Sequence, residues 1–204
     1  MDDGGPTANP VGIFANPLHP GLAADTFDSS YKCMLKGYEQ SYKKIEHIIV
    51  DGGSKDNTIS IIKNYKFKNK KIFIKKKLGV YESINYGISK SAGDYIIILN
   101  SDDFFQSNNT IQNIIKQITI NKSYDIFLGN VAYFDDLDYY RVTRFYSSKN
   151  FKRWKMKLGL MPPHPASIIS KKVYKKYGAY TENFKIAGDF EFFLRLFYKN
   201  KIRY

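Results

Sequence analysis

Short apolar runs that end in polar turns, separated by amphipathic segments of helical length, fill residues 45–120 of the chain. The run at 47–50 ends in the turn 51–54 (DGGS), and the run at 95–99 ends in the turn 100–103 (NSDD). Strand-like runs that alternate with helical segments indicate βαβ units and a mostly parallel sheet. Ligands of such open sheets bind beyond the carboxyl ends of the strands, so both turns are candidate binding elements.

The spacing of apolar residues predicts the individual elements. Residues 125–134 and 139–146 are expected to form an antiparallel pair around 135–138, because two apolar segments flank an acidic turn. The predicted fold class is α/β, with a mostly parallel central sheet and a small antiparallel element. We expect strands at 47–50, 71–75, 95–99 and 166–170, and helices from 54 or 56 to 66, at 81–91, 109–120 and 149–158, with two more after residue 170.

Composition narrows the class of protein. A length of 204 residues suits one substantial domain. The single cysteine, Cys33, excludes a disulfide framework and a cysteine-rich zinc site. Apolar runs stay well short of the roughly 20 residues that span a bilayer. The acidic, Pro-rich and Gly-rich start differs from a secretory signal, so we expect a cytoplasmic protein that can contact the inner face of the cell membrane.

The charge is strongly basic and unevenly distributed. The formal net charge is +13, yet residues 1–31 contain four Asp and no Lys or Arg. This balance suits an anionic partner, namely nucleic acid, acidic lipid or a phosphate-bearing substrate. A lysine-rich composition that only solvates the surface is the simpler explanation.

Residues 1–30 differ from the rest of the chain, since they hold four of the seven prolines and no Lys. Their one strand-like piece is 11–15, which contains Gly12 and is flanked by prolines. We expect this segment to be either an atypical leader or an altered first strand. Residues 31–204 are expected to form the domain.

Oxygen-bearing side chains gather in the turn at 100–103. Mg²⁺ and Mn²⁺ favour carboxylates together with substrate phosphate oxygens, so Asp102 is the best candidate metal ligand. Asn100 and Asp103 can assist directly or through water. The alternative is an ordinary Asx turn that caps the next helix.

Three further places carry candidate residues, each with a structural alternative. Asp51 and Gly53 can hold a base or ribose, or simply make a tight turn between strand and helix. Asp189 and Glu191 can serve chemistry, or complement the dipole at a helix start. His164 lies between two prolines and can line a pocket, or act as a structural loop histidine.

Three blocks of sequence together resemble the family 2 glycosyltransferases of the GT-A fold, in the branch found in bacterial exopolysaccharide and lipopolysaccharide gene clusters. The resemblance covers about residues 32–204. It implies a three-layer α/β/α sandwich with a nucleotide-sugar half at about 31–105 and an acceptor half at about 106–204. The blocks are IEHIIVDGGSKDNT, GVYESINYGISKSAGDYIIILNSDD and PPHPASIISKKVYKKYGAYTENFKIAGDFEFFLRL.

The resemblance also implies roles for individual residues. Asp189 falls on the catalytic base, with Glu191 as its neighbour, and His164 falls on the acceptor side. Asp102 falls on the principal ligand of a divalent metal, Mg²⁺ or Mn²⁺. The nucleotide-sugar donor is expected to contact Asp51, Gly53, Asn85, Asn100, Ser101 and Asp103.

These roles describe inverting transfer of a sugar from a nucleotide-diphosphate sugar to a glycan or lipid-linked acceptor, in surface polysaccharide biosynthesis. Peripheral contact with an anionic membrane fits such an acceptor. Two alternatives stay open: a catalytically silent relative that binds nucleotide or glycan, and a basic nucleic-acid-binding protein. The sequence contains no recognised nucleic-acid-binding module, so nucleic acid is not among the expected partners.

The chain departs from the family pattern in three places. The segment 1–30 is a poor copy of the expected hydrophobic first strand. Lysines at 75–77 stand where this branch often has an acidic residue, and the sequence ends at Tyr204, soon after the helix expected to carry Asp189. We therefore treat a truncated or silent relative as the main alternative to an active enzyme.

Overall fold

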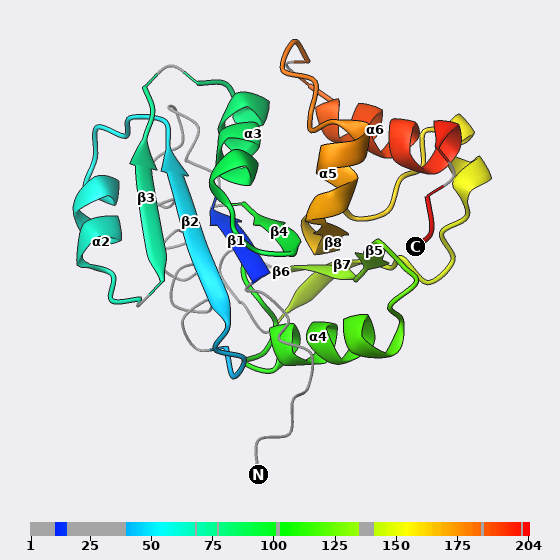
Figure 1. The fold of residues 1–204 in the computed structure, drawn as a ribbon, viewed down its shortest axis with the longest axis horizontal. Coiled ribbons are helices and arrows are strands. Elements are labelled where there is room, and N and C mark those ends of the chain that lie inside the picture. The colour runs from blue at the N-terminus through cyan, green and yellow to red at the C-terminus, as the bar shows by residue number, and fades with distance from the viewer. Residues whose placement is uncertain are drawn as a thin grey trace.

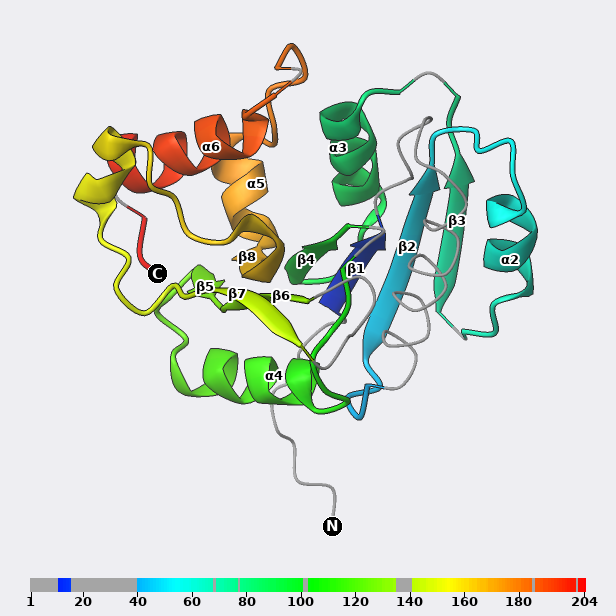
Figure 2. The same ribbon diagram turned by 180° about the vertical axis from the view of Figure 1, so that it is seen from behind.

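A computed structural model describes residues 11–15, 40–67, 69–76, 78–100, 103–134, 141–184, 186–200 and 202–204. Its centre is a six-stranded sheet with the order β3-β2-β1-β4-β8-β5. Helices cover both faces, which gives three layers (Figures 1 and 2). The strands are β1 (Val11–Ala15), β2 (Ile45–Asp51), β3 (Lys70–Ile74), β4 (Tyr95–Leu99), β5 (Ile126–Leu128) and β8 (Ser167–Ser170).

The first four strands are parallel, and β8 runs antiparallel to both β4 and β5. β1 lies between β2 and β4, with Val11 opposite Ile45 on one side and Tyr95 on the other. The expected α/β fold with a mostly parallel sheet is therefore confirmed. The divisions of the chain near residues 30 and 105 stay predictions.

Apolar residues on both faces of the central strands explain why helices cover both sides. On one face of β2, Ile48 and Val50 pack in a cluster with residues of α3, α5 and α6. On the other face, Ile49 packs against α2. The helices are α2 (Thr58–Asn64), α3 (Val80–Lys90), α4 (Thr110–Ile120), α5 (Lys171–Tyr177) and α6 (Gly188–Phe193), with a π-helix η3 (Leu194–Lys199) after α6 and 3₁₀ helices η1 (Arg153–Leu158) and η2 (His164–Ala166).

The buried carboxylate of Glu46 ties β2 to the loop between α3 and β4. One oxygen accepts hydrogen bonds from Ser91 Oγ at 2.9 Å and from the backbone N–H groups of Ala92 and Gly93 at 2.5 and 2.7 Å. The other oxygen accepts from Lys71 Nζ at 2.9 Å. Burial acts to raise the pKa of Glu46, but these hydrogen bonds outweigh it and lower the pKa below its usual value.

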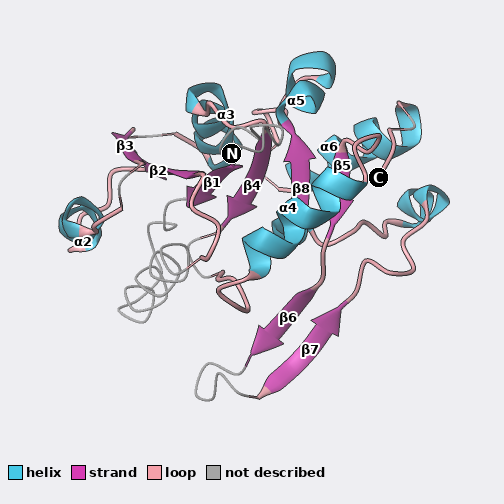
Figure 3. Ribbon diagram, turned by 60° about the horizontal axis from the view of Figure 1, so that its bottom comes forward, coloured by secondary structure: helices cyan, strands magenta, loops and turns pink. Residues whose placement is uncertain are grey.

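The predicted antiparallel pair is wrong in its first part. Ile126 is fully buried, and its strand β5 joins the central sheet beside β8. The pair is instead made of β6 (Val131–Phe134) and β7 (Val142–Tyr146), which project from the body in Figure 3. The chain turns at Gly129, whose N–H donates to the Ala166 carbonyl at 2.7 Å and where a Cβ would lie 3.1 Å from that oxygen.

Two predicted helices are shorter than expected. α2 begins at Thr58, whose N–H donates to the Asp56 carboxylate at 3.0 Å. The segment 149–158 forms only the 3₁₀ helix η1. Among the described residues, no helix combines the length and the apolar character needed to cross a membrane.

Candidate active site

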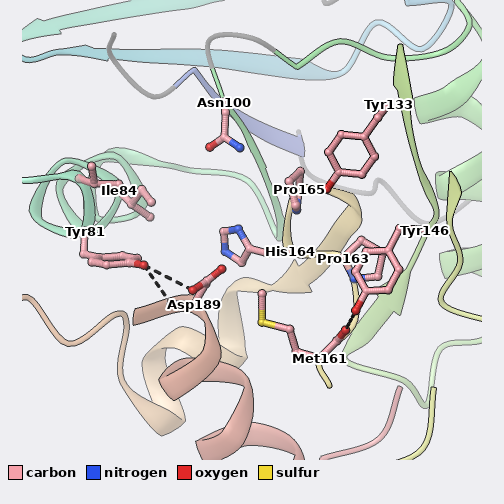
Figure 4. A pocket seen from close by; sticks show the side chains of 11 residues that line it. Tyr81, Ile84, Asn100, Tyr133, Tyr146, Met161, Pro163, His164, Pro165 and Asp189 are labelled. Carbon is pink, nitrogen blue, oxygen red and sulfur yellow. Dashed lines mark hydrogen bonds between the residues drawn. The ribbon is translucent and has the colours of Figure 1, made fainter. Parts of the chain in front are cut away.

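A cavity of about 280 Å³ opens at the carboxyl end of β4 (Figure 4). Its walls come from α3, from the residue after β4, from β6 and β7, from the loop around η2 and from the start of α6. This is the place where open α/β sheets bind ligands. The cavity is lined by Val80, Tyr81, Ile84, Asn100, Tyr133, Tyr146, Met161, Pro163, His164, Pro165 and Asp189.

Asp189 is the carboxylate in the cavity wall, and it occupies the first turn of α6. Its Oδ1 atom accepts the N–H of Phe190 at 2.9 Å. The Tyr81 hydroxyl donates to the same oxygen at 3.4 Å and accepts the N–H of Asp189 at 3.3 Å. Burial is the main cause of a raised pKa at Tyr81, so its phenol stays protonated at neutral pH. Asp189 is thus oriented by a neutral hydrogen-bond donor, the Tyr81 hydroxyl.

Close packing around Gly188 brings Tyr81 and Asp189 together. A Cβ atom at position 188 would lie only 2.6 Å from the Tyr81 ring, so the position requires glycine. Ala187, just before it, has a φ of 61°, in the left-handed region that non-glycine residues rarely adopt. The start of α6 is therefore shaped by the tyrosine that lies against it.

His164 contributes a neutral imidazole to the cavity wall, next to Asp189 in Figure 4. Its Nε2 atom lies 2.7 Å from the Tyr180 hydroxyl, and its ring packs against Phe193. Burial lowers the pKa of His164, although the nearby Asp189 carboxylate acts in the other direction. The Tyr180 ring in turn stacks on Tyr81 at a centroid distance of 5.7 Å. The two tyrosines thus connect His164 to Asp189 through one aromatic layer.

The polar turn after β4 reaches the cavity through Asn100. The Asn100 amide donates to Asp103 Oδ2 at 2.8 Å, and the Asp103 N–H donates to the Asn100 carbonyl at 3.1 Å. Amide and carboxylate oxygens are the ligand types that hard divalent cations prefer, so the donor chemistry here fits Mg²⁺ or Mn²⁺. Two residues predicted for this turn, Ser101 and Asp102, lie outside the described residues.

The turn after β2 is organised by Asp51, which is almost fully buried. Its carboxylate accepts the N–H groups of Gly53 and Ser54 at 2.8 and 2.9 Å and the Ser54 hydroxyl at 2.7 Å. Gly53 has a φ of +94°, and a Cβ there would lie 2.8 Å from Lys76 Cγ. The predicted strand-to-helix turn is therefore present, with its carboxylate bonded to its own backbone.

Two other predicted residues bond to protein groups and are not among those that line the cavity. The Asn85 amide accepts the N–H of Tyr180 at 2.9 Å and donates to the Tyr180 carbonyl at 2.8 Å, which fixes that segment against α3. Glu191 forms an ion pair with Arg195 at 2.9 Å. The hydrogen bond from Arg195 is the main reason that the pKa of Glu191 is lowered.

The structure thus brings Asn100, His164 and Asp189 to one cavity, from predicted blocks that are distant in sequence. Tyr81 and Tyr180 are functional candidates that sequence reasoning did not single out. Tyr81 did lie inside the second quoted block, directly after Gly79 and Val80, and that position was the available signal.

The sequence model of glycosyl transferase family 2 matches residues 31–178, which is well over half of the chain. The chain belongs to glycosyl transferase family 2. The match extends over the turns after β2 and β4 and over His164, and it ends before Asp189.

Curated relatives agree with this family. The chain is 32% identical over 118 residues to glycosyltransferase GlyG of Streptococcus pneumoniae, a match that covers 55% of the chain and 38% of GlyG. It is 28% identical over 161 residues to an uncharacterized glycosyltransferase of Mycobacterium tuberculosis, which covers 76% of the chain and 59% of that protein. The chain therefore spans well under two thirds of the length of these relatives.

Solved structures of glycosyltransferases share the fold. Staphylococcus aureus TarS superposes with a TM-score of 0.71 at 19% identity, covering 91% of this chain and 33% of TarS. TarS 1–349 in complex with UDP-GlcNAc gives 0.69 at 18% identity, covering 92% and 52%. The mannosyltransferase PcManGT from Pyrobaculum calidifontis, in complex with GDP-Man and Mn²⁺, gives 0.61 at 16% identity, covering 87% and 49%. The expected GT-A fold is confirmed.

Proposed function

We propose that this family 2 member transfers a sugar, with inversion, from a nucleotide-diphosphate sugar to a glycan or lipid-linked acceptor in surface polysaccharide biosynthesis. One observation carries the proposal. Asp189 and Asn100 line the same cavity at the end of β4, and the sequence resemblance implies the roles of catalytic base and of first residue in the metal and diphosphate turn for them.

Asp189 is proposed to take the proton from the acceptor hydroxyl as that hydroxyl attacks the anomeric carbon. A general base needs to lie within hydrogen-bond reach of the proton that it removes, and Asp189 faces open space in the cavity. The protonated phenol of Tyr81 helps to fix its orientation, because it donates to Asp189 Oδ1. General-base catalysis is typically worth about 10²–10⁴-fold in rate.

The donor is proposed to lie along the carboxyl ends of β2 and β4. Asp51 and Gly53 shape the turn that would meet the nucleoside, while Asn100, Ser101 and Asp103 would meet the diphosphate. Asn85 is proposed to act indirectly, because its amide holds the backbone of Tyr180. Support for a nucleotide-sugar donor comes from the UDP-GlcNAc complex of TarS, which has this fold.

A divalent cation, Mg²⁺ or Mn²⁺, is proposed to be held by Asp102 as principal ligand, with Asn100 and Asp103 as supporting oxygens. Such a cation supplies charge stabilisation for the departing nucleoside diphosphate. The oxygen donors of Asn100 and Asp103 fit this class of ion. The Mn²⁺ in the PcManGT complex is a further support.

The acceptor is proposed to enter on the side of His164. Its neutral ring can hydrogen-bond an acceptor hydroxyl without adding charge beside Asp189. Glu191 is proposed to support this side through its contact with Thr181, whose hydroxyl donates to it at 3.1 Å. A lipid-linked acceptor would place the enzyme in the cytoplasm, at the inner face of the cell membrane.

The proposal is tested by thermal unfolding with UDP, GDP, CDP or ADP, each with and without Mn²⁺, followed by transfer assays with the sugar donors of the nucleotide that binds. A ligand at 100 times its dissociation constant stabilises the folded state by about 2.7 kcal/mol. We expect a metal-dependent shift with one nucleotide, lost in Asp102→Ala. We expect transfer to be lost in Asp189→Asn, with nucleotide binding retained.

Asp56→Asn is the matched control, because Asp56 is an exposed aspartate whose Oδ1 accepts the N–H of Thr58. It should change neither binding nor transfer. Nucleotide binding without turnover over a broad donor and acceptor panel would show a silent relative. Full transfer by Asp189→Asn would refute the assignment of the base.

A further inference from the structure

Three large apolar side chains stand exposed on one short segment. Trp154, Leu158 and Leu160 expose 58%, 65% and 51% of their surface. The segment itself is anchored, because Met156 between them is 1% exposed and η1 packs against η3. Several large apolar side chains exposed on one anchored segment are a feature of interaction surfaces.

Cations alternate with these apolar side chains. In a 3₁₀ helix, residues three apart lie on the same face, so Lys157 lies beside Trp154 and Lys155 beside Leu158. The Lys157 ammonium also lies 5.2 Å from the ring of Tyr198, which is 42% exposed on η3. We call Trp154, Lys157, Leu158, Leu160 and Tyr198 the η1 surface.

The sequence around this surface carries charge of a single sign. Residues 141–181 contain eleven Lys or Arg and no Asp or Glu. Cations close to an anionic membrane attract it, and the attraction falls with distance over about a Debye length. Aromatic and aliphatic side chains beside lysines are the composition of elements that lie in a membrane interface.

We infer that the η1 surface docks on an anionic phospholipid bilayer. Trp154, Leu158 and Leu160 would enter the boundary between headgroups and acyl chains. Lys157, together with Lys152, which is exposed directly before η1, would meet lipid phosphates. A nucleic acid would satisfy the lysines, but its phosphate backbone offers nothing to the two exposed leucines. The bilayer is therefore the partner that uses the whole surface.

The segment with η1 begins and ends at the cavity wall. Tyr146 precedes it and Met161 follows it, both line the cavity, and the Tyr146 hydroxyl donates to the Met161 carbonyl (Figure 4). Docking through η1 would bring this wall close to the membrane. The benefit of this closeness for a lipid-linked acceptor rests on the proposed function, whereas the inferred binding of η1 to the bilayer does not.

Trp154 provides a direct test, because it is the only tryptophan in the chain. The full chain is mixed with vesicles of phosphatidylcholine, with or without phosphatidylglycerol, and Trp emission and co-sedimentation are recorded. We expect the emission to shift to shorter wavelength, and the protein to sediment, only with the anionic vesicles. Both effects should weaken as salt is raised.

Two double variants separate the contributions of the lysines and of the leucines to vesicle binding. Lys152→Gln with Lys157→Gln should lower the partition coefficient about thirtyfold, since each cation near the surface contributes about a factor of five. Leu158→Ser with Leu160→Ser should lower it at least about tenfold. Both positions of each pair are exposed, so we expect the variants to fold, and circular dichroism is used to check this.

Matched controls come from α4 and the turn directly after it, and α4 lies on another part of the molecule (Figure 1). Lys116→Gln with Lys122→Gln, and Ile120→Ser at a residue that is 74% exposed, should leave vesicle binding unchanged. Equal loss in the controls, equal binding to neutral vesicles, or an emission shift with single-stranded RNA and none with vesicles would overturn the inference. None of these measurements requires a sugar donor, so failed transfer and failed docking are distinguished.

Discussion

The Tyr81 hydroxyl makes two hydrogen bonds with Asp189, donating to Oδ1 at 3.4 Å and accepting the backbone N–H at 3.3 Å. Both bonds hold the carboxylate at the start of α6, so Tyr81 acts as a positioning residue for the proposed base. We expect Tyr81→Phe to lower kcat about tenfold, the value of one modest hydrogen bond, with little change in KM for the donor. Steady-state kinetics with the natural donor measures both quantities.

Tyr86→Phe is the control for this prediction. Tyr86 is on the same helix, and its ring packs on Phe73 at 5.3 Å, away from the residues that line the cavity. Its kinetics should match those of the wild type. If Tyr81→Phe also kept the wild-type kcat, the positioning role would be refuted.

Gly188 should not tolerate a methyl group. In Gly188→Ala, the new Cβ would lie 2.6 Å from the Tyr81 ring, so α6 or the ring has to move. Overpacking of this kind costs about 1–3 kcal/mol of stability. We expect a lower Tm together with reduced transfer, measured on the same preparation.

Gly79→Ala serves for comparison, since a Cβ there would meet Glu82 at an ordinary contact distance of 3.5 Å. It should cost no more than about 1 kcal/mol at this helix start. Equal destabilisation by the two substitutions would show that the contact with Tyr81 is unimportant.

Glu46 should be a main stabiliser of the nucleotide side of the sheet. Glu46→Gln removes a buried charge that receives four hydrogen bonds, and we expect it to lower the free energy of unfolding by about 2–3 kcal/mol at pH 7. Because folding lowers the pKa of Glu46, its contribution is present above the unfolded value of 4.5 and is lost as pH falls through the folded value. Urea unfolding at several pH values measures the difference.

Lys71→Met provides the contrast. The Lys71 side chain is 45% exposed, so its ion pair with Glu46 is screened by solvent. We expect a loss below about 1 kcal/mol. A larger loss than in Glu46→Gln would place the stabilisation in the ion pair rather than in the bonds to Ser91, Ala92 and Gly93.

His47 should make stability fall as the solution becomes acidic. Its ring is buried between Tyr65 and Phe67, and no hydrogen-bond partner of its Nε2 is found among the described residues. Burial, assisted by Lys70, lowers its pKa to about 4. The unfolded chain binds the proton near pH 6.5, so stability is full above that pH and is lost on going down towards 4.

Between pH 6.5 and pH 5 the loss should reach about 2 kcal/mol, since each pH unit is worth about 1.4 kcal/mol per proton. His47→Phe keeps an aromatic ring and removes the titration, so its stability should be flatter over this range. Parallel slopes for the two proteins would mean that other groups, such as His164, account for the acid sensitivity.

The strands predicted well from the sequence are those whose apolar residues form one continuous run with clear boundary residues. Tyr95–Leu99 is an uninterrupted apolar run with three consecutive isoleucines, bounded by Gly93 and Asn100, and it forms β4 with the predicted limits. The segment 125–134 contains Gly129 and Asn130, but apolar residues stand on both sides of them. The pattern of apolar residues cannot tell which sheet each half joins.

The site residues likewise include some that the sequence could suggest and one that it could not. Asp189, His164 and Asn100 could be proposed because each is part of a recognisable block. Tyr81 also lies in such a block, but its contact with Asp189 could not be proposed, because the chain has seventeen tyrosines and the two residues are 108 positions apart. Tertiary packing at Gly188 decides that pair, and packing of this kind leaves no local pattern.

The strands of the central sheet cannot all join it in the order in which they occur in the chain, because β8 lies between β4 and β5. β5 leaves the ribosome before β8, yet it joins the sheet by pairing with β8, which also pairs with β4. The edge strand β5 can therefore join the sheet only after β8 has paired with β4. Asn100 follows β4 and His164 precedes β8, so both walls of the cavity meet only at this late step. A nascent chain can complete β2 and β3 early, but it has no cavity until β8 has been made.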